Sequence, residues 1–356
     1  MIPGITCRTV RQLLDVCGTP EDVLSLGLGD LRQIFGKRED IISAITGKST
    51  FARAEQELRY AEQHHIKILF YTDSEYPQRL NQPDCEDTPP LLYFRGTADL
   101  NAPRVVSVVG SRQATEYGKE LTRRLVDGFR HEDVTVVSGL AYGIDTSSHT
   151  AAVSNGLPTV GVVAHGLDTV YPSQNRHLAE DMVNTGGGII TEYPSFTNIL
   201  PAYFPARNRI IAALSDVVVV AEAAKTGGAL ITANLAIGYH REVLAFPGRV
   251  GDKYSEGCNR IIANSKARLI TCADDLFEAM NWDRRHATQP RQQTLALDLA
   301  PDETVVYNLL AERKELSIDE INQLCDLTMP KVASALLSLE LKNICRCLPG
   351  KRYRLN

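Results

Sequence analysis

The sequence has 356 residues, enough for two or more domains. It contains no run of about 18 residues that is both uncharged and predominantly apolar, which excludes a membrane-spanning helix, and residues 1–10 lack the basic start and apolar stretch of a signal peptide. We therefore expect a cytoplasmic protein. The net charge of -5 excludes a surface that is positive all over, so any site for a polyanion must be local.

Residues 1–65 are predicted to form a compact helical domain, because apolar positions recur at helical spacing over 10–18 and 21–35. Residues 1–14 fit a helix-hairpin-helix turn, in which a Pro-Gly bend directs backbone N–H groups at a phosphate. Thr6 stands where a second glycine is usual. Plain packing of a SAM-like helical domain is therefore the alternative interpretation.

Residues 66–282 alternate short apolar runs with segments of helical length. After two runs at 66–71 and 89–96, strands are predicted at 104–110, 134–139, 158–164, 187–192, 216–222, 241–248 and 267–272. Strands that are apolar on both faces and separated by helices indicate a mainly parallel sheet covered on both sides. The predicted fold class is α/β, with an extended Rossmann-like core.

Residues 283–300 are polar, show no clear period and are interpreted as a linker. Residues 301–356 predict three helices and a β-hairpin, the pattern of a winged helix domain. The presumed recognition helix, 328–343, carries only Lys331 and Lys342 as cations. A surface that contacts DNA backbones or another protein therefore fits this domain better than a reader of base sequence.

Four of the predicted strands are followed by Gly, Ser or Thr with a cation nearby. Carboxyl ends of neighbouring parallel strands meet at one edge of a sheet, so these loops should converge. Glycine lets an anion approach the backbone, helix N-terminal amides donate to it, and arginine adds a forked donor. The predicted phosphate ligands in these loops are Gly110, Ser111, Arg112, Ser138, Gly139, Arg176, Lys225, Thr226 and Gly227.

The phosphates are predicted to belong to a nucleic acid. The first loop lacks Gly-x-Gly-x-x-Gly and the chain has no P-loop, which excludes a dinucleotide or P-loop site. Arg207, Asn208 and Arg209 open the segment before strand 216–222, and we expect this segment to fold back over the sheet edge toward Arg112 and Lys225. Bases of a single strand stack on aromatic side chains, and nearby loops contain Tyr171, Tyr193, Phe196, Tyr203 and Phe204.

Seven motifs between residues 66 and 275 resemble, in unbroken order, the DNA-processing protein A family (DprA, also called Smf). They are VVGSRQATEYG, VVSGLAYGIDTSSHTAA, GLDTVYPSQNRHLA, ITEYP, FPARNRIIAALSD, TGGALITANLA and VLAFPG with EGCNRIIANSKARLI. The resemblance implies a cytoplasmic homodimer that binds single-stranded DNA without sequence preference, loads the RecA recombinase and serves natural transformation. It implies no enzymatic activity, cofactor or metal.

The resemblance assigns DNA contact to Gly110, Ser111, Arg112, Ser138, Gly139, Arg176, Arg207, Asn208, Arg209 and Lys225. This chain departs from the family pattern in having Thr226-Gly227-Gly228 for a more usual Ser-Gly-Ser, and Lys266 where glycine is common. These differences affect the expected rim of the site.

An enzymatic alternative is a hydrolase that cleaves the base from nucleoside monophosphates, since such enzymes share the Rossmann superfamily. They carry a catalytic glutamate a few residues after a glycine-rich loop, and the comparable loop here, residues 225–236, has no carboxylate. Ser138, Asp145 and His149 could suggest a catalytic triad. Asp145 and His149 are four residues apart, however, and are interpreted as a helix first-turn acid and a packed histidine.

Overall fold

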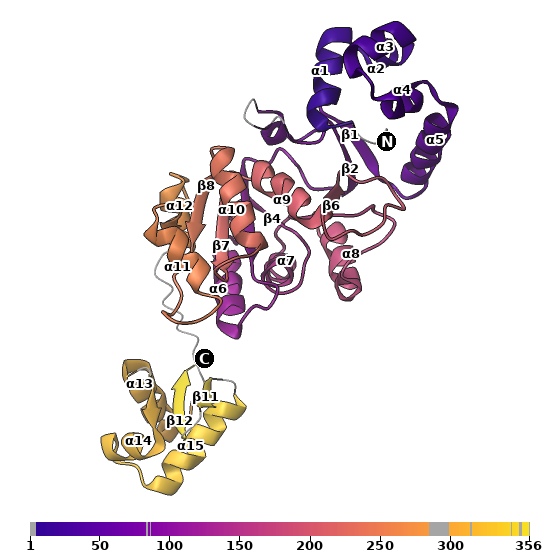
Figure 1. Ribbon diagram of the computed structural model, residues 1–356. Helices are drawn as coiled ribbons and strands as arrows, with labels where there is room; N and C mark the ends of the chain where they lie inside the picture. Colours follow the sequence, from indigo (N-terminus) through magenta and orange to yellow (C-terminus); the bar gives the residue numbers. More distant parts are fainter. Residues whose placement is uncertain are drawn as a thin grey trace. The chain divides into compact units, whose positions relative to one another are not determined.

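The computed structural model describes residues 5–82, 85, 87–284, 299–313, 315–342, 344–348 and 351–355. The chain divides into two compact units, Met1–Ala287 and Thr288–Asn356 (Figure 1). Most of the predicted linker lies outside the described residues, and the predicted domain boundary near residue 65 stays a prediction. No helix among the described residues is both long and apolar enough to span a membrane.

The first unit is built on a nine-stranded sheet, which confirms the predicted α/β class. All seven predicted core strands are present, and the two earlier runs form two more. The strands are β1 (Lys67–Phe70), β2 (Leu91–Gly96), β3 (Arg104–Gly110), β4 (Val134–Ser138), β5 (Thr159–Val162), β6 (Gly188–Thr191), β7 (Val217–Glu222), β8 (Glu242–Ala245) and β9 (Arg268–Leu269).

Their spatial order is β1-β2-β6-β5-β4-β3-β7-β8-β9. Strands β3 to β9 run parallel to one another, whereas β2 is antiparallel to both β1 and β6. From β3 the chain first builds the sheet outward to β6 and then returns to place β7 on the other side of β3. This reversal puts a topological switch point between β3 and β7, where open parallel sheets bind their ligands.

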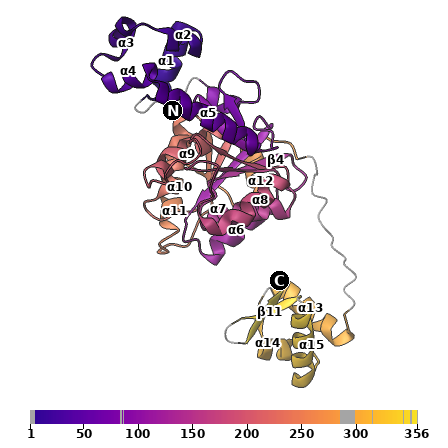
Figure 2. The ribbon, with the colours of Figure 1, turned by 90° about the vertical axis from the view of Figure 1, so that its right-hand side faces the viewer.

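Helices cover both faces of this sheet (Figure 2). One face carries α6 (Glu116–Asp127), α7 (Ile144–Ser154), α8 (Arg176–Asn184) and α12 (Ala273–Ala279); the other carries α9 (Tyr203–Leu214), α10 (Gly228–Gly238) and α11 (Glu256–Ala263). Alternate residues of each central strand face opposite layers. In β3, Val106 and Val108 pack in the α6–α7 layer, while Val105 and Val109 pack in the α9–α10 layer.

The N-terminal segment is helical, as predicted. It comprises α1 (Cys7–Cys17), α2 (Pro20–Ser25), α3 (Leu28–Phe35), α4 (Glu39–Thr46) and α5 (Lys48–Gln63). Leu31, Ile41, Ile42 and Ile45 form its small apolar core. The hydroxyl oxygen of Thr6 accepts a hydrogen bond from the N–H of Thr9 at 3.2 Å and so caps α1. The Pro3-Gly4 bend of the predicted hairpin lies outside the described residues.

The second unit has the predicted winged helix pattern. It consists of α13 (Pro301–Arg313), β10 (Leu316–Ser317), α14 (Ile318–Leu324), α15 (Met329–Leu341), β11 (Cys345–Leu348) and β12 (Arg352–Leu355), with strands in the order β10-β12-β11. Both lysines of the recognition helix contact acidic residues of α13. Lys331 pairs with Asp302 at 3.5 Å, and Lys342 donates to Glu303 at 2.7 Å.

Candidate nucleic-acid interface

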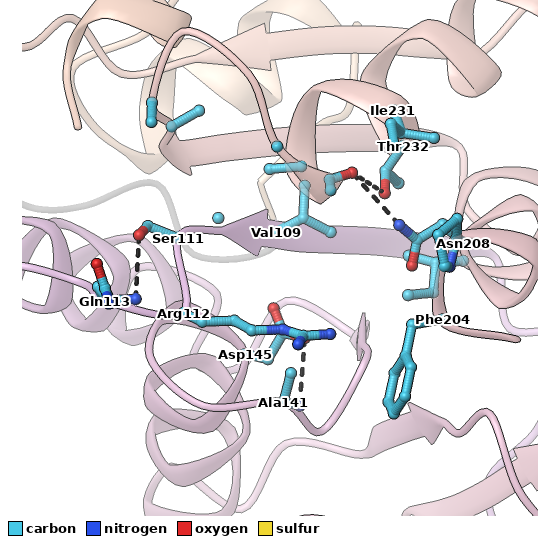
Figure 3. Close-up of a pocket in the computed structure, with 18 of the residues that line it drawn as sticks. Val109, Ser111, Arg112, Gln113, Ala141, Asp145, Phe204, Asn208, Ile231 and Thr232 are labelled. Atoms are coloured by element: carbon cyan, nitrogen blue, oxygen red, sulfur yellow. Dashed lines mark hydrogen bonds between the residues drawn. The ribbon is translucent and has the colours of Figure 1, made fainter. Parts of the chain in front are cut away.

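A crevice of about 730 Å³ opens at the carboxyl ends of β3 and β7, at the switch point (Figure 3). It is formed by the loops after β3, β4, β5 and β7 together with the N-terminal parts of α9 and α10. The four loops that the strand-end pattern predicted to converge thus each contribute to the crevice. The predicted residues that line the crevice are Gly110, Ser111, Arg112, Arg207, Asn208, Thr226 and Gly227.

The N-terminus of α10 forms one wall of this crevice. The helix starts at Gly228, and the preceding Gly227 has no side chain with which to cap the first turn. A Cβ at Gly227 would meet no atom within 4 Å, so open space adjoins this backbone. An anion in that space can accept hydrogen bonds from the first N–H groups of the helix and is favoured by the helix dipole.

The rim of the crevice presents an exposed cation beside aromatic rings. The guanidinium carbon of Arg112 lies 5.1 Å from the ring centre of Phe204, and Phe204 lies 5.7 Å from Tyr171. Lys225 is exposed, between Ala224 and Thr226, which both line the crevice. Cations next to partly exposed rings suit a strand whose phosphates and bases alternate along its length. We name Arg112 and Lys225 the rim cations.

The polar residues that line the crevice but were not predicted as site residues include Tyr254 and Gln113. Tyr254, from the loop before α11, lines the crevice wall and donates a hydrogen bond from its hydroxyl to Oε1 of Gln113. The exposed Lys253 approaches the Tyr254 ring at 5.3 Å. Loop 246–255 follows the carboxyl end of the parallel strand β8. The expectation that loops after parallel strands converge at one sheet edge therefore applies to this loop as well. The sequence signal was its Gly-Arg-Val-Gly-Asp-Lys-Tyr run, at 248–254.

Arg207 forms the buried floor of the crevice and is not an exposed phosphate ligand. Its residue is only 3% exposed, and Nη1 donates to the carbonyl oxygen of Gly139 at 2.7 Å and to that of Val162. Burial lowers the pKa of Arg207 to about 10, against the attraction of Asp145, which leaves the guanidinium charged at pH 7. Asp145 is also buried, and that burial raises its pKa. The opposite charges of the two residues attract each other beneath the rim.

Asn208 also has a structural role. Its Nδ2 donates to the carbonyl oxygen of Gly228 at 3.3 Å, and the hydroxyl of Thr232 donates to the same oxygen at 3.1 Å (Figure 3). This contact joins α9 to the first residue of α10. The expected fold-back of this segment over the sheet edge is therefore present for Arg207 and Asn208.

Arg209 does not reach the crevice, contrary to the expectation that it meets Arg112 and Lys225. Nη1 and Nη2 donate to the two carboxylate oxygens of Glu192 at 2.5 and 2.7 Å, and Nε donates to the carbonyl oxygen of Asp87 at 2.8 Å. Arg207 and Arg209 are two residues apart on a helix, so their side chains leave it about 200° apart. Burial lowers the pKa of Arg209, but the hydrogen bonds and charge of Glu192, with smaller effects of Cys7, together raise it more, so the pKa lies above its usual value.

The predicted ligands in the β4 loop are used inside the fold. Ser138 is buried, and its hydroxyl donates to the carbonyl oxygen of Val108 at 2.7 Å. A Cβ at Gly139 would lie 2.6 Å from both terminal nitrogens of Arg207, so glycine is needed there for packing. A Cβ at Gly110 would lie 2.5 Å from Ile144. Sequence cannot distinguish a glycine that faces a ligand from one that faces a buried neighbour.

Arg176 is exposed at the start of α8 but is not among the residues that line the crevice. The residue before it, Asn175, is buried, and its Nδ2 donates to the carbonyl oxygen of Leu140 at 2.8 Å. This bond joins the loop after β5 to the loop after β4. A contact between Arg176 and DNA would therefore require a strand that extends beyond the crevice, and it stays a prediction.

Ser138, Asp145 and His149 do not form a catalytic triad. Nδ1 of His149 is hydrogen-bonded to the hydroxyl of Thr159 at 2.7 Å, and the Ser138 hydroxyl is directed at a backbone carbonyl. Burial, with a smaller effect of the Arg207 charge, lowers the pKa of His149 to about 3. The histidine is therefore neutral and packed, as predicted. Glu222, at the end of β7, accepts hydrogen bonds from the N–H and hydroxyl of Thr115 and anchors the start of α6.

The fold and this crevice define a class: an extended Rossmann-like protein with its ligand crevice at the switch point, joined to a winged helix domain. Comparison with known proteins gives the family. Residues 67–281 match the model of DNA recombination-mediator protein A, and residues 289–351 match the DprA winged helix domain. The chain belongs to the DNA recombination-mediator protein A (DprA/Smf) family.

Curated relatives and solved structures agree with this assignment. DNA processing protein DprA of Streptococcus pneumoniae is 36% identical over 76% of this chain and 93% of its own. Protein Smf of Escherichia coli is 33% identical over 85% and 80%. The X-ray structure of the S. pneumoniae protein matches with a TM-score of 0.64 at 34% identity, covering 77% of this chain and 93% of that one.

DNA processing protein A from Helicobacter pylori, whose structure is described as showing a single-stranded DNA binding mode, matches with a TM-score of 0.54 at 27% identity. The match covers 61% of this chain and 95% of that one.

Proposed function

We propose that this protein binds single-stranded DNA without sequence preference, with the strand lying along the crevice at the ends of β3 and β7. The observation that supports this most is the combination on the rim of an exposed Arg112, the rings of Phe204 and Tyr171, and the uncapped N-terminus of α10. None of these groups reads a base edge, so affinity should depend on phosphates and stacking. The described binding mode of the H. pylori relative supports the same ligand.

Titration of labelled oligothymidine at several salt concentrations tests the proposal. Neutralised phosphates release counterions, so log affinity should fall with log salt by about 0.7 per contact for a single strand. Arg112→Ala and Lys225→Ala should each weaken binding and reduce that slope by about 0.7. Arg268→Ala and Lys67→Ala are matched controls, because both side chains are about half exposed and pair with Glu278 and Glu75 instead. A salt-independent affinity would contradict phosphate binding.

We further propose that the protein acts as a homodimeric recombination mediator that loads the RecA recombinase onto the bound strand, as in natural transformation, within the cytoplasm. The family's description as a recombination mediator supports this role. The test is RecA-catalysed strand exchange on DNA already coated by a single-strand-binding protein. Addition of this chain should remove the lag before exchange, and an unchanged lag would contradict loading. Sedimentation equilibrium tests the dimer.

Hydrolysis of nucleoside monophosphates is the competing function, because the crevice volume would admit one nucleotide. The carboxylate that lines the crevice, Asp145, is buried next to Arg207 and is 8% exposed. A general base must reach the water that it activates. Release of free base from nucleoside monophosphates, followed by chromatography, distinguishes the two functions; turnover would favour the hydrolase.

A further inference from the structure

The backbone of Ser195 is held by two charged side chains of α5. Nη2 of Arg53 donates to the Ser195 carbonyl oxygen at 2.6 Å, and the Ser195 N–H donates to Oε1 of Glu57 at 2.8 Å. Arg53 and Glu57 are one turn apart and form an ion pair at 2.9 Å. We call Arg53, Glu57 and Ser195 the Ser195 clamp.

Two residues of the clamp are buried, and the third, Arg53, is partly exposed, with 32% of its side chain accessible. The Glu57 side chain is 2% exposed and Ser195 is 2% exposed. Removing a carboxylate from water costs several kcal/mol unless its hydrogen bonds are replaced. A helix that needed only to pack against this loop could do so with apolar side chains. The pair is instead arranged so that one peptide position receives both a donor and an acceptor, which fixes that position in space.

The residue after the clamp is held in an uncommon conformation. Phe196 has a φ of 63°, in the left-handed region that bulky residues rarely adopt. Its N–H donates to Oδ1 of Asp168 at 2.7 Å, and its ring meets the edge of Tyr60 at 5.0 Å. Such a conformation persists only when its surroundings determine it. Here α5 and the β5–α8 loop together provide those surroundings.

Both loops joined in this way carry aromatic residues of the proposed DNA site. Asp168 lies three residues before Tyr171, which lines the crevice. Beyond the clamp, segment 193–204 leads through Pro201, another lining residue, to Phe204 on the rim. Within that segment Tyr193 and Tyr203 stack at 4.5 Å with 25° between their planes. Fixing Ser195 therefore fixes the start of segment 193–204, and the end of this segment supplies Phe204 to the rim.

We propose that Arg53 and Glu57 are positioning residues for base stacking: they hold the loop of Ser195 so that the aromatic side chains at the crevice mouth stand ready for a single strand. This inference rests on the proposed binding of single-stranded DNA. Neither residue contacts the strand, and neither contributes to phosphate binding. Their loss should therefore weaken stacking while the number of phosphate contacts stays the same.

The experiment uses the full chain and oligothymidine with a central 2-aminopurine, whose fluorescence is quenched when the base stacks. In Arg53→Met and Glu57→Leu we expect about tenfold weaker binding, because stacking of bases on the aromatic side chains contributes to affinity, and partial recovery of fluorescence at saturation. The slope of log affinity against log salt should equal that of the wild type. Arg53→Lys and Glu57→Gln keep one donor or acceptor and should show intermediate quenching.

The control is Arg59→Met on the same helix, since Arg59 is 78% exposed and its ion-pair partner is Glu55. Wild-type quenching and affinity in the folded clamp variants overturn the inference. If Arg53→Met and Glu57→Leu fail to fold, the two conservative variants decide in the same way, with unchanged quenching counting against positioning. Failure of the proposed function itself is distinguishable, because the wild type would then show no salt-dependent binding.

Discussion

The rim and the floor of the crevice both contain arginine, and the two environments give it opposite roles. Arg112 on the rim is exposed beside the ring of Phe204, where its donors can reach a ligand. Arg207 on the floor is 3% exposed and donates to two carbonyl oxygens. A cation surrounded by backbone carbonyls stabilises the fold, whereas one facing solvent can bind phosphate. Substitutions should therefore separate into those that reduce stability and those that reduce binding.

The largest expected effect is that of Arg207→Met. Removing the guanidinium leaves two buried carbonyl oxygens without a donor and Asp145 without its counter-charge, which should lower the free energy of unfolding by about 3–5 kcal/mol. Urea denaturation followed by circular dichroism measures this loss. A stability within 1 kcal/mol of the wild type, joined to weaker DNA binding, would place Arg207 with the rim residues instead.

The second largest loss of stability is expected for Gly139→Ala, compared with Gly227→Ala. In Gly139→Ala the new methyl group must displace Arg207 and Asp145, which lie 2.6 and 2.7 Å from its position, and overpacking of this kind costs about 1–3 kcal/mol. Gly227→Ala is the matched control, because its Cβ meets no atom within 4 Å and its φ of 161° is extended. Thermal melting should separate the two variants clearly. Equal melting temperatures would contradict the assignment of Gly139 to the floor.

Stability should also depend on pH through the buried His149. Its pKa is about 3 in the folded protein and near 6.5 when unfolded, so between these values the unfolded chain binds more protons. Stability is therefore lost as pH falls, by about 2 kcal/mol from pH 6.5 to 4.5. Asp145 acts in the opposite direction, because its pKa is raised. Comparing urea midpoints of the wild type and His149→Gln isolates the histidine contribution; parallel pH profiles would refute it.

The smallest expected effect on stability belongs to the rim. Arg112→Ala and Lys225→Ala remove exposed side chains, so each should change the free energy of unfolding by no more than about 0.5 kcal/mol. The same two variants should lose affinity for oligothymidine, as described above. A rim variant that loses as much free energy of unfolding as Arg207→Met would contradict the different roles of rim and floor.

Much of the fold was predictable from the sequence, because it depends on local patterns. The β-branched runs at 104–110 and 216–222 are buried on both faces, and such runs identify central parallel strands. The turns after them could be located as ligand loops, since the carboxyl ends of parallel strands always share an edge. Loop 246–255 was overlooked although the same rule covers it, because its Lys253 and Tyr254 stand well beyond the strand end.

The sequence by itself determined the α/β fold, the winged helix pattern, the family and the loops that meet at the switch point, because periodicity and motif order are properties of the chain alone. Only the tertiary structure decided which polar residues remain available to a ligand. Arg207, Arg209 and Ser138 are residue types that commonly bind phosphate. In this fold, however, their side chains donate hydrogen bonds to Gly139, Glu192 and Val108, respectively. Burial and hydrogen-bond partners come from segments far apart in the chain, and no local pattern records them.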